Sequence, residues 1–229
     1  MWSPLSLGLQ LRPQEFIIAV LLRIGLPVFE RDGPCPACLQ PSDRFGDHSV
    51  GCASLGERIA RHNHLRDALY HTAQSANLAP LREERALLPG GDRPADVLLP
   101  HYAGGRHQAV DVCVVSSLQG QLVEGASTIP GHALAHRYQQ KWQKYGDACD
   151  REGISFLPAP VEVLGGFHEA TVGLVKRLGE SLARAGGQDE RDVIRHLFQR
   201  LSVLLIRGSS SLILSRIPTQ PNPSIDGIT

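Results

Sequence analysis

The segment RPADVLLPHYAGGRHQAVDVCVV, residues 93–115, decides the expected fold. Its two apolar runs, 95–100 and 107–115, are rich in Val and Leu and are bounded by turn-forming residues, which is typical of strands. Gly104 and Gly105 between them supply the backbone freedom that a tight hairpin turn requires. The segment therefore predicts two neighbouring strands joined by a hairpin.

Each predicted strand carries one aspartate, Asp96 in the first and Asp111 in the second. A carboxylate among apolar residues is costly to bury unless a cation compensates its charge. Mg²⁺, which prefers carboxylate and phosphate oxygens, is such a cation, and Glu84 on the preceding segment is a candidate third carboxylate. The pair indicates a metal site for phosphodiester hydrolysis. The alternative is that each aspartate is only a charge at a strand end or a sheet edge.

A predicted helix over 133–151 supplies cations to this site. Its apolar stripe, expected to pack on the sheet, consists of Leu134, Tyr138, Trp142, Tyr145 and Cys149. At about 100° per residue, Lys141 falls beside that stripe, with Arg137 and Lys144 on the same flank. A lysine there can reach the end of the sheet and stabilise charge on a reacting phosphate. The alternative for this flank is a solvated basic face.

The rest of the chain adds helices and strands around the hairpin. Periodicity and turn residues predict helices over 14–24, 55–76, 168–185 and 190–206, and strands over 81–88 and 154–164. SLGE (54–57) has the pattern of a capping box with Ser54 as the N-cap. Pro158 and Pro160 place the last strand at an edge or break it. This order predicts an α/β sandwich with a mixed sheet.

A second cluster, CPACLQPSDRFGDHSVGC (35–52), has the spacing of a zinc site. Cys35, Cys38, His48 and Cys52 offer three thiolates and one imidazole, and four such ligands suit tetrahedral Zn²⁺. The segment is too short and too polar for a core of its own, so metal binding would supply its folding energy. Four protein ligands leave no open position, which predicts a structural zinc. The alternative is a loop with incidental free cysteines.

The composition limits the class of protein. Lys plus Arg and Asp plus Glu both number 23, so any nucleic-acid binding must come from local patches or from a partner. The odd number of cysteines, five, argues against a secreted disulfide framework. The apolar runs near the two ends are too short or too interrupted to span a bilayer. We expect a protein of a reducing compartment, nuclear or cytoplasmic, that is not secreted and does not bind a membrane.

Taken together, these motifs resemble the restriction-like endonuclease region that follows reverse transcriptase in certain site-specific non-LTR retrotransposons. The resemblance covers roughly 14–217 and rests on the order of the Cys-Cys-His-Cys knuckle, RH (61–62), RPAD (93–96), VDV (110–112) and KWQKY (141–145). That family belongs to the PD-(D/E)xK nucleases, whose αβββαβ core agrees with the predicted order of elements. Two positions depart from the pattern. Cys113 stands where most such enzymes have the lysine, and Ala95 adds one residue between Pro94 and Asp96.

The resemblance implies nicking of target DNA that depends on Mg²⁺ or Mn²⁺. Asp96 and Asp111 would hold the metal. Lys141 or Lys144, on the following helix, would match the lysine that is displaced from the position of Cys113. The basic residues expected to bind nucleic acid are Arg58, Arg61, His62, Arg66 and Arg137. The implied partners are DNA, the element's RNA and an upstream reverse transcriptase domain.

The expected organisation is an N-terminal helical segment (1–30), a zinc knuckle (31–54), a nuclease domain (55–217) and a disordered tail (218–229). The alternative function is a catalytically inactive, nucleic-acid-binding remnant of such an element. A helix orientation that turns both lysines away from the aspartates would favour this alternative. A zinc-stabilised interaction protein without DNA binding is a third interpretation. It predicts no basic groove around Arg58, Arg61, Arg66, Lys141 and Lys144.

Overall fold

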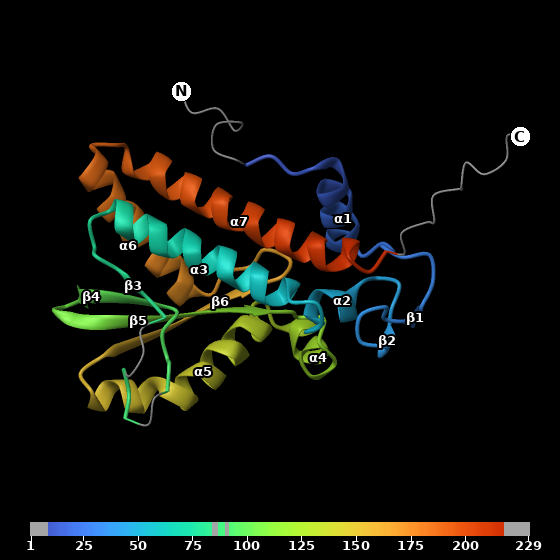
Figure 1. Cartoon of the computed structure of the whole chain (residues 1–229), viewed down its shortest axis with the longest axis horizontal. Coiled ribbons are helices and arrows are strands. Elements are labelled where there is room, and N and C mark those ends of the chain that lie inside the picture. Colours follow the sequence, from blue (N-terminus) through green and yellow to red (C-terminus); the bar gives the residue numbers. More distant parts are fainter. Residues whose placement is uncertain (1–8, 84–86, 90–91, 218–229) are drawn as a thin grey trace, which may run out of the picture.

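A computed structural model of the chain describes residues 9–83, 87–89 and 92–217 (Figure 1). Its helices are α1 (Pro13–Arg23), α2 (Asp47–Gly51), α3 (Glu57–Ser75), α4 (Gly120–Thr128), α5 (His132–Arg151), α6 (Glu169–Gly186) and α7 (Glu190–Leu214). Its strands are β1 (Gly33–Pro34), β2 (Pro41–Ser42), β3 (Leu81–Arg82), β4 (Val97–Ala103), β5 (Arg106–Val115) and β6 (Ser155–Glu162). The expected tail 218–229 lies outside the described residues.

The predicted hairpin forms the centre of a four-stranded sheet with the order β3-β4-β5-β6. Strands β3, β4 and β5 are antiparallel neighbours and β6 runs parallel to β5, so the sheet is mixed as predicted. Gly104 and Gly105 both have positive φ angles, 60° and 84°, which glycine adopts without strain. Strand β6 is an edge strand, where Pro158 and Pro160 are tolerated because one row of its N–H groups has no neighbouring strand.

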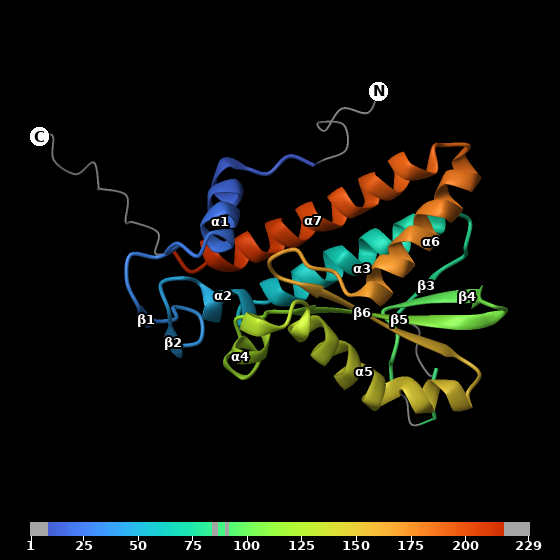
Figure 2. The same cartoon turned by 180° about the vertical axis from the view of Figure 1, so that it is seen from behind.

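Helices cover both faces of this sheet (Figures 1 and 2). Helix α5 packs on one face, α3 and α6 pack on the other, and α7 packs on α3 and α6. Side chains alternate along β5, as in any strand. Val110 and Val112 join the core with α3 and α6, whereas Ala109 joins the cluster that includes Cys149 of α5. By the same alternation, Asp111 faces α5.

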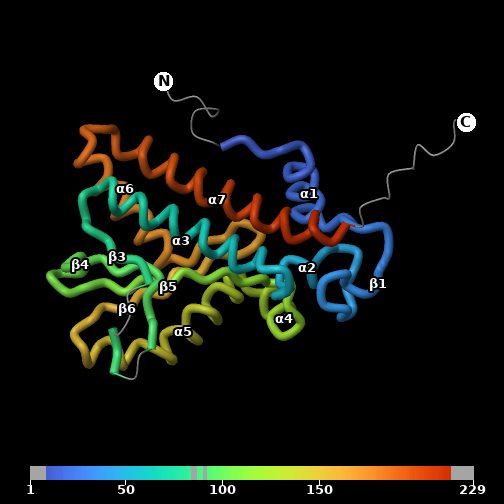
Figure 3. The backbone as a smooth tube through the Cα atoms, viewed as in Figure 1, coloured from blue at the N-terminus to red at the C-terminus, as the bar shows by residue number. Residues whose placement is uncertain are grey.

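Helix α7 is longer than the expected 190–206 and continues through Gly208. It runs beside α3 for much of its length (Figure 3). A Cβ at Gly208 would overlap the side chain of Arg61 on α3, so glycine permits the close approach of the two helices. Among the described residues, α7 is also the one helix whose length and composition would suit a membrane span. Leu205 and Leu212 are fully buried within the protein, as in a core helix.

Three local features of the structure differ from the expectations drawn from the sequence. The N-cap of α3 is Gly56 with φ 80° and not Ser54, because the backbone enters the helix in a left-handed conformation and leaves no side-chain cap. The strand expected over 81–88 is only Leu81–Arg82, and 84–86 lie outside the described residues. Helix α4 was not predicted, since its short apolar pattern lies between Gly-containing turns.

The segment 31–54 does not stand apart from the rest of the protein. Val50 of α2 shares a buried apolar cluster with Ile18 of α1, Val163 after β6 and Ile213 of α7. Figure 1 shows β1, β2 and α2 beside α1 and the end of α7. This segment therefore gains its apolar contacts from elements that are distant in the sequence.

The contact between α3 and α7 predicts an effect of Gly208→Val. The added side chain would displace Arg61 from a packed interface, which we expect to lower the free energy of unfolding by about 1–3 kcal/mol. Gly120→Val is the matched control, because a Cβ at Gly120 meets no atom within 4 Å. Chemical denaturation of both variants measures the difference, and equal stability losses would contradict the proposed close contact.

Candidate functional site

The four predicted zinc ligands lie together. The ligand atoms of Cys35, Cys38, His48 and Cys52 are all within 4.8 Å of one another, so this group could hold a metal ion such as zinc. The Sγ atom of Cys38 is 3.2 Å from Nε2 of His48. Among the described residues, this is the one group of three or more such side chains close enough to share an ion.

Local hydrogen bonds place the ligands from α2. The Asp43 carboxylate accepts from the backbone N–H groups of Asp47 and His48, at 3.0 and 2.9 Å. These contacts hold the first turn of α2, which carries His48 toward the cysteines. Gly46 has φ 89° and lies so close to Val28 and Ile213 that a Cβ would be crowded. The turn before α2 therefore requires glycine for two reasons, the positive φ angle and the lack of space for a side chain.

Arg216, just after α7, lies beside the thiols of this cluster. Its buried side chain donates to the Ser54 carbonyl at 3.2 Å and also contacts the Leu212 carbonyl. Burial by itself would raise the pKa of Cys52. Hydrogen bonds from Arg216 and from the Ser54 amide outweigh burial and lower that pKa to about 6. A depressed thiol pKa favours the thiolate, which is the form that binds metal.

This geometry predicts that the chain binds one zinc ion and that Cys52→Ser abolishes tight binding, because the site loses one thiolate. Cys149→Ala is the control, since Cys149 belongs to α5 and is buried in a different cluster. Metal analysis after dialysis against a chelator measures retained zinc. Equal zinc retention in the Cys52→Ser variant and the unmodified chain would show that these residues do not form the site.

The two aspartates of the hairpin occupy adjacent positions on neighbouring strands. Val97 pairs with Val110, and the Asp96 amide donates to the Val110 carbonyl at 2.9 Å. Asp96, one residue before β4, is therefore opposite Asp111 on β5. The pairing register therefore sets the two residues opposite each other, and the convergence of their carboxylates on one metal ion stays a prediction.

Asp111 forms a buried ion pair with Lys141 of α5. Only 7% of Asp111 is exposed, and the Lys141 Nζ atom lies 2.8 Å from Oδ2 and 3.2 Å from Oδ1. Burial raises the pKa of Asp111, and the charge of Lys141 opposes that effect. Burial alone would lower the pKa of Lys141, but the charge and hydrogen bond of Asp111 outweigh it and raise the pKa. Lys141 therefore stays positively charged where it contacts the sheet.

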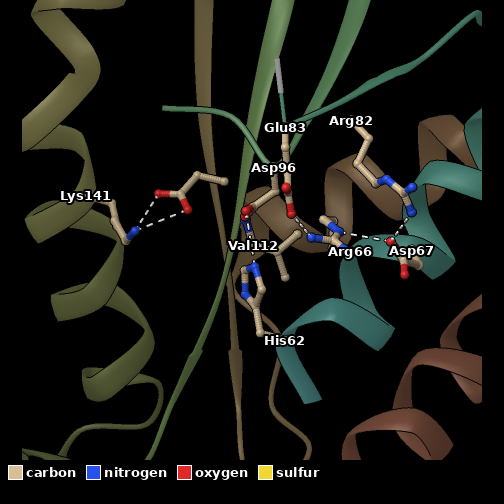
Figure 4. A network of polar contacts seen from close by, with 9 residues as sticks. His62, Arg66, Asp67, Arg82, Glu83, Asp96, Val112 and Lys141 are labelled. Carbon is tan, nitrogen blue, oxygen red and sulfur yellow. Dashed lines mark hydrogen bonds and ion pairs between the residues drawn. The ribbon is translucent and has the colours of Figure 1, made fainter. Parts of the chain in front are cut away.

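Asp96 has a partner on each of its carboxylate oxygens (Figure 4). The Val112 amide donates to Oδ2 at 2.7 Å, and Nε2 of His62 lies 3.1 Å from Oδ1. His62 belongs to α3, on the face of the sheet opposite to α5. The acidic pair is thus held between two helices, with Lys141 on one side and His62 on the other.

A network of ion pairs surrounds Asp96 on the α3 side (Figure 4). Arg66 contacts Glu83, and its Nε lies 2.9 Å from the Asp67 carboxylate. Arg82 reaches the same carboxylate at 3.3 Å. Arg66 is buried, and burial alone would lower its pKa, but the contacts with Asp67 and Glu83 outweigh burial and raise the pKa. The network ties the end of β3 to α3 beside the aspartates.

The structure separates the two candidate lysines. Lys144 is exposed and lies over the ring of Tyr145, 4.6 Å from its centroid, whereas Lys141 contacts Asp111. Cys113 does not replace the lysine, because a thiol never carries a positive charge. Burial raises its pKa to about 12 and keeps it neutral. The third carboxylate proposed from the sequence, Glu84, lies outside the described residues.

The residues expected to bind nucleic acid differ in how exposed they are. Arg58 is exposed at the start of α3. Arg61 is 2% exposed and donates to the Ser209 hydroxyl at 3.1 Å, so it cannot reach a DNA backbone in this conformation. Arg66 is buried in the ion-pair network, and Arg137 donates to Gln140 at 2.6 Å. Helical spacing alone could not distinguish the buried guanidinium groups from the exposed one.

Sequence reasoning missed the partners of the expected ligands. The contact between His62 and Asp96 joins α3 to the hairpin, and Arg216 joins the end of α7 to the cysteines. One signal for the first was present, since His62 and Arg66 are four residues apart and share a helix face.

No protein-family model matches the chain, and no curated protein matches it at a significant level.

Proposed function

We propose that this protein is a metal-dependent DNA endonuclease that nicks its target, as in the polyproteins of non-LTR retrotransposons. The observation that carries the proposal is the ion pair of Lys141 with Asp111, opposite Asp96, which immediately precedes the adjoining strand β4. Two carboxylates and a retained cation at the end of a sheet are the groups that phosphodiester hydrolysis requires.

The order of the elements supports the proposal. Helix α3, strands β3, β4 and β5, helix α5 and strand β6 follow one another in the αβββαβ order of the PD-(D/E)xK nucleases, with α4 added before α5. Asp111 lies on β5 and Asp96 immediately before β4, and the lysine is on a helix that follows them, as the resemblance implies for the displaced lysine.

The donor set suits a hard divalent cation. Asp96 and Asp111 offer carboxylate oxygens, which Mg²⁺ and Mn²⁺ prefer, and Oδ2 of Asp111 is a buried oxygen without a well-aligned hydrogen bond. Two protein carboxylates do not fill the coordination sphere of Mg²⁺. Water and a substrate phosphate would complete it, as is common for this ion. When bound, such an ion would acidify a water molecule and neutralise charge on the phosphate.

The side chains then have separate roles. Asp96 and Asp111 would bind the ion, and Lys141 would leave its partner to stabilise the extra charge on the phosphate oxygens as the water attacks. A positively charged ammonium group placed before the reaction needs little reorganisation, which is why such groups are effective. Cys35, Cys38, His48 and Cys52 would hold a structural zinc at a distance from this chemistry.

The alternative is an inactive remnant that binds nucleic acid. One observation favours it, because two of the expected DNA contacts, Arg61 and Arg66, are committed to internal hydrogen bonds and ion pairs. The orientation of Lys141 toward Asp111 favours the nuclease. We place the protein in the nucleus or cytoplasm, with DNA, element RNA and an upstream reverse transcriptase domain as its proposed partners.

The proposal predicts metal-dependent nicking of supercoiled plasmid by the zinc-loaded protein. Lys141→Met should lower the rate by about 10²–10³-fold, as expected for loss of a charge-stabilising group. Lys144→Met should leave the rate nearly unchanged, because Lys144 contacts Tyr145 and not the aspartates. Asp111→Asn should abolish nicking through loss of a metal ligand.

The two outcomes separate the alternatives. Nicking that depends on Mg²⁺ or Mn²⁺ and disappears in the Lys141 and Asp111 variants supports the nuclease. If the unmodified protein binds zinc and retards DNA in a gel without nicking it under any metal condition, the inactive remnant is the better description.

A further inference from the structure

His62 has a position that its sequence context did not reveal. The sequence placed it among the residues expected to touch DNA. In the structure its ring points from α3 toward Asp96, and its Nε2 lies 3.1 Å from Oδ1 of that residue (Figure 4). The His62 side chain is 29% exposed and the Asp96 side chain 19%. The contact is therefore partly shielded from water, and it joins a helix to the end of the sheet.

This contact completes the orientation of a carboxylate. The backbone amide of Val112 already holds Oδ2 of Asp96 at 2.7 Å. That single hydrogen bond would leave the carboxylate free to turn about the axis of its side chain. With His62 on Oδ1, both oxygens are fixed, and each still has a lone pair available for a cation. Because the carboxylate accepts, Nε2 carries the proton and donates it.

The neighbours of His62 leave it free for this role. Arg66, one turn along the same face of α3, is instead occupied by ion pairs with Asp67 and Glu83. Lys141 approaches from the opposite face and contacts Asp111. Among the described residues, His62 is thus the side chain that holds Asp96, as Lys141 is the side chain that holds Asp111.

We propose that His62 is a positioning residue of the metal site, which fixes the Asp96 carboxylate through its Nε2–H group and so sets the affinity for the divalent cation. This inference rests on the proposed nuclease function. Groups that orient a ligand from outside the coordination sphere commonly change metal affinity or activity by about 10–100-fold when they are removed. His62 would act through Asp96 without touching the ion or the DNA.

Binding of Mn²⁺ to the zinc-loaded chain, followed by electron paramagnetic resonance of the free ion, tests the role without turnover. His62→Ala should weaken Mn²⁺ binding by about 10–100-fold. His62→Gln, whose amide can still donate to Asp96, should recover most of the affinity. In nicking assays the His62→Ala defect should shrink as the Mn²⁺ concentration rises. Zinc content and circular dichroism of each variant confirm that it is folded.

Asp96→Ala distinguishes failure of this inference from failure of the nuclease proposal. If Asp96→Ala binds Mn²⁺ as well as the unmodified chain, the metal site itself is wrong. If Asp96→Ala loses Mn²⁺ but both His62 variants bind it within about twofold of the unmodified chain, only the role of His62 is overturned. The same holds if His62→Ala weakens DNA binding in the absence of divalent metal and leaves Mn²⁺ affinity unchanged, because His62 would then contact DNA.

Discussion

The buried ion pair of Asp111 and Lys141 is the constraint on which the arrangement of this site depends. An ionised carboxylate inside a protein costs several kcal/mol in lost hydration, and an approaching cation with good geometry offsets that cost. The alternation of β5 directs Asp111 to the same face as Ala109, under α5. Helix α5 must therefore lie with Lys141 over the strand. A rotation by one residue would replace the lysine with Gln140 or Trp142 and leave the carboxylate unpaired.

Helix α3 connects the two candidate metal sites. Its first turn follows Cys52 and lies near Arg216, whose guanidinium contacts the carbonyl of Ser54. Further along, the same helix presents His62 to Asp96. The cysteine cluster also shares its apolar core with α1 and α7. A zinc ion would therefore stabilise more than its own loop, because the position of α3 relative to the sheet depends on the same contacts.

Much of the fold follows from local patterns. The hairpin was predictable because Gly104 and Gly105 separate two apolar runs rich in Val and Leu. Helix α5 was predictable because its apolar stripe has a clear helical period. The grouping of Cys35, Cys38, His48 and Cys52, which could hold a metal ion, was predictable from their spacing alone. Other features were not. Gly208 reads as a helix breaker, yet it lies where α3 and α7 touch, and only the partner helix explains it. Arg61 reads as a DNA contact, yet Ser209 of α7 holds it.

The sequence by itself determined which groups are present: four soft metal ligands close together along the chain, two aspartates in paired strands, and lysines on one flank of a helix. The tertiary structure alone decided which of these groups meet. It selected Lys141 over Lys144, because the crossing of α5 over β5 carries one ammonium to Asp111 and turns the other toward Tyr145. It also joined His62 to Asp96 from 34 residues away. Contacts of this kind depend on how elements pack, and packing is set by the whole core.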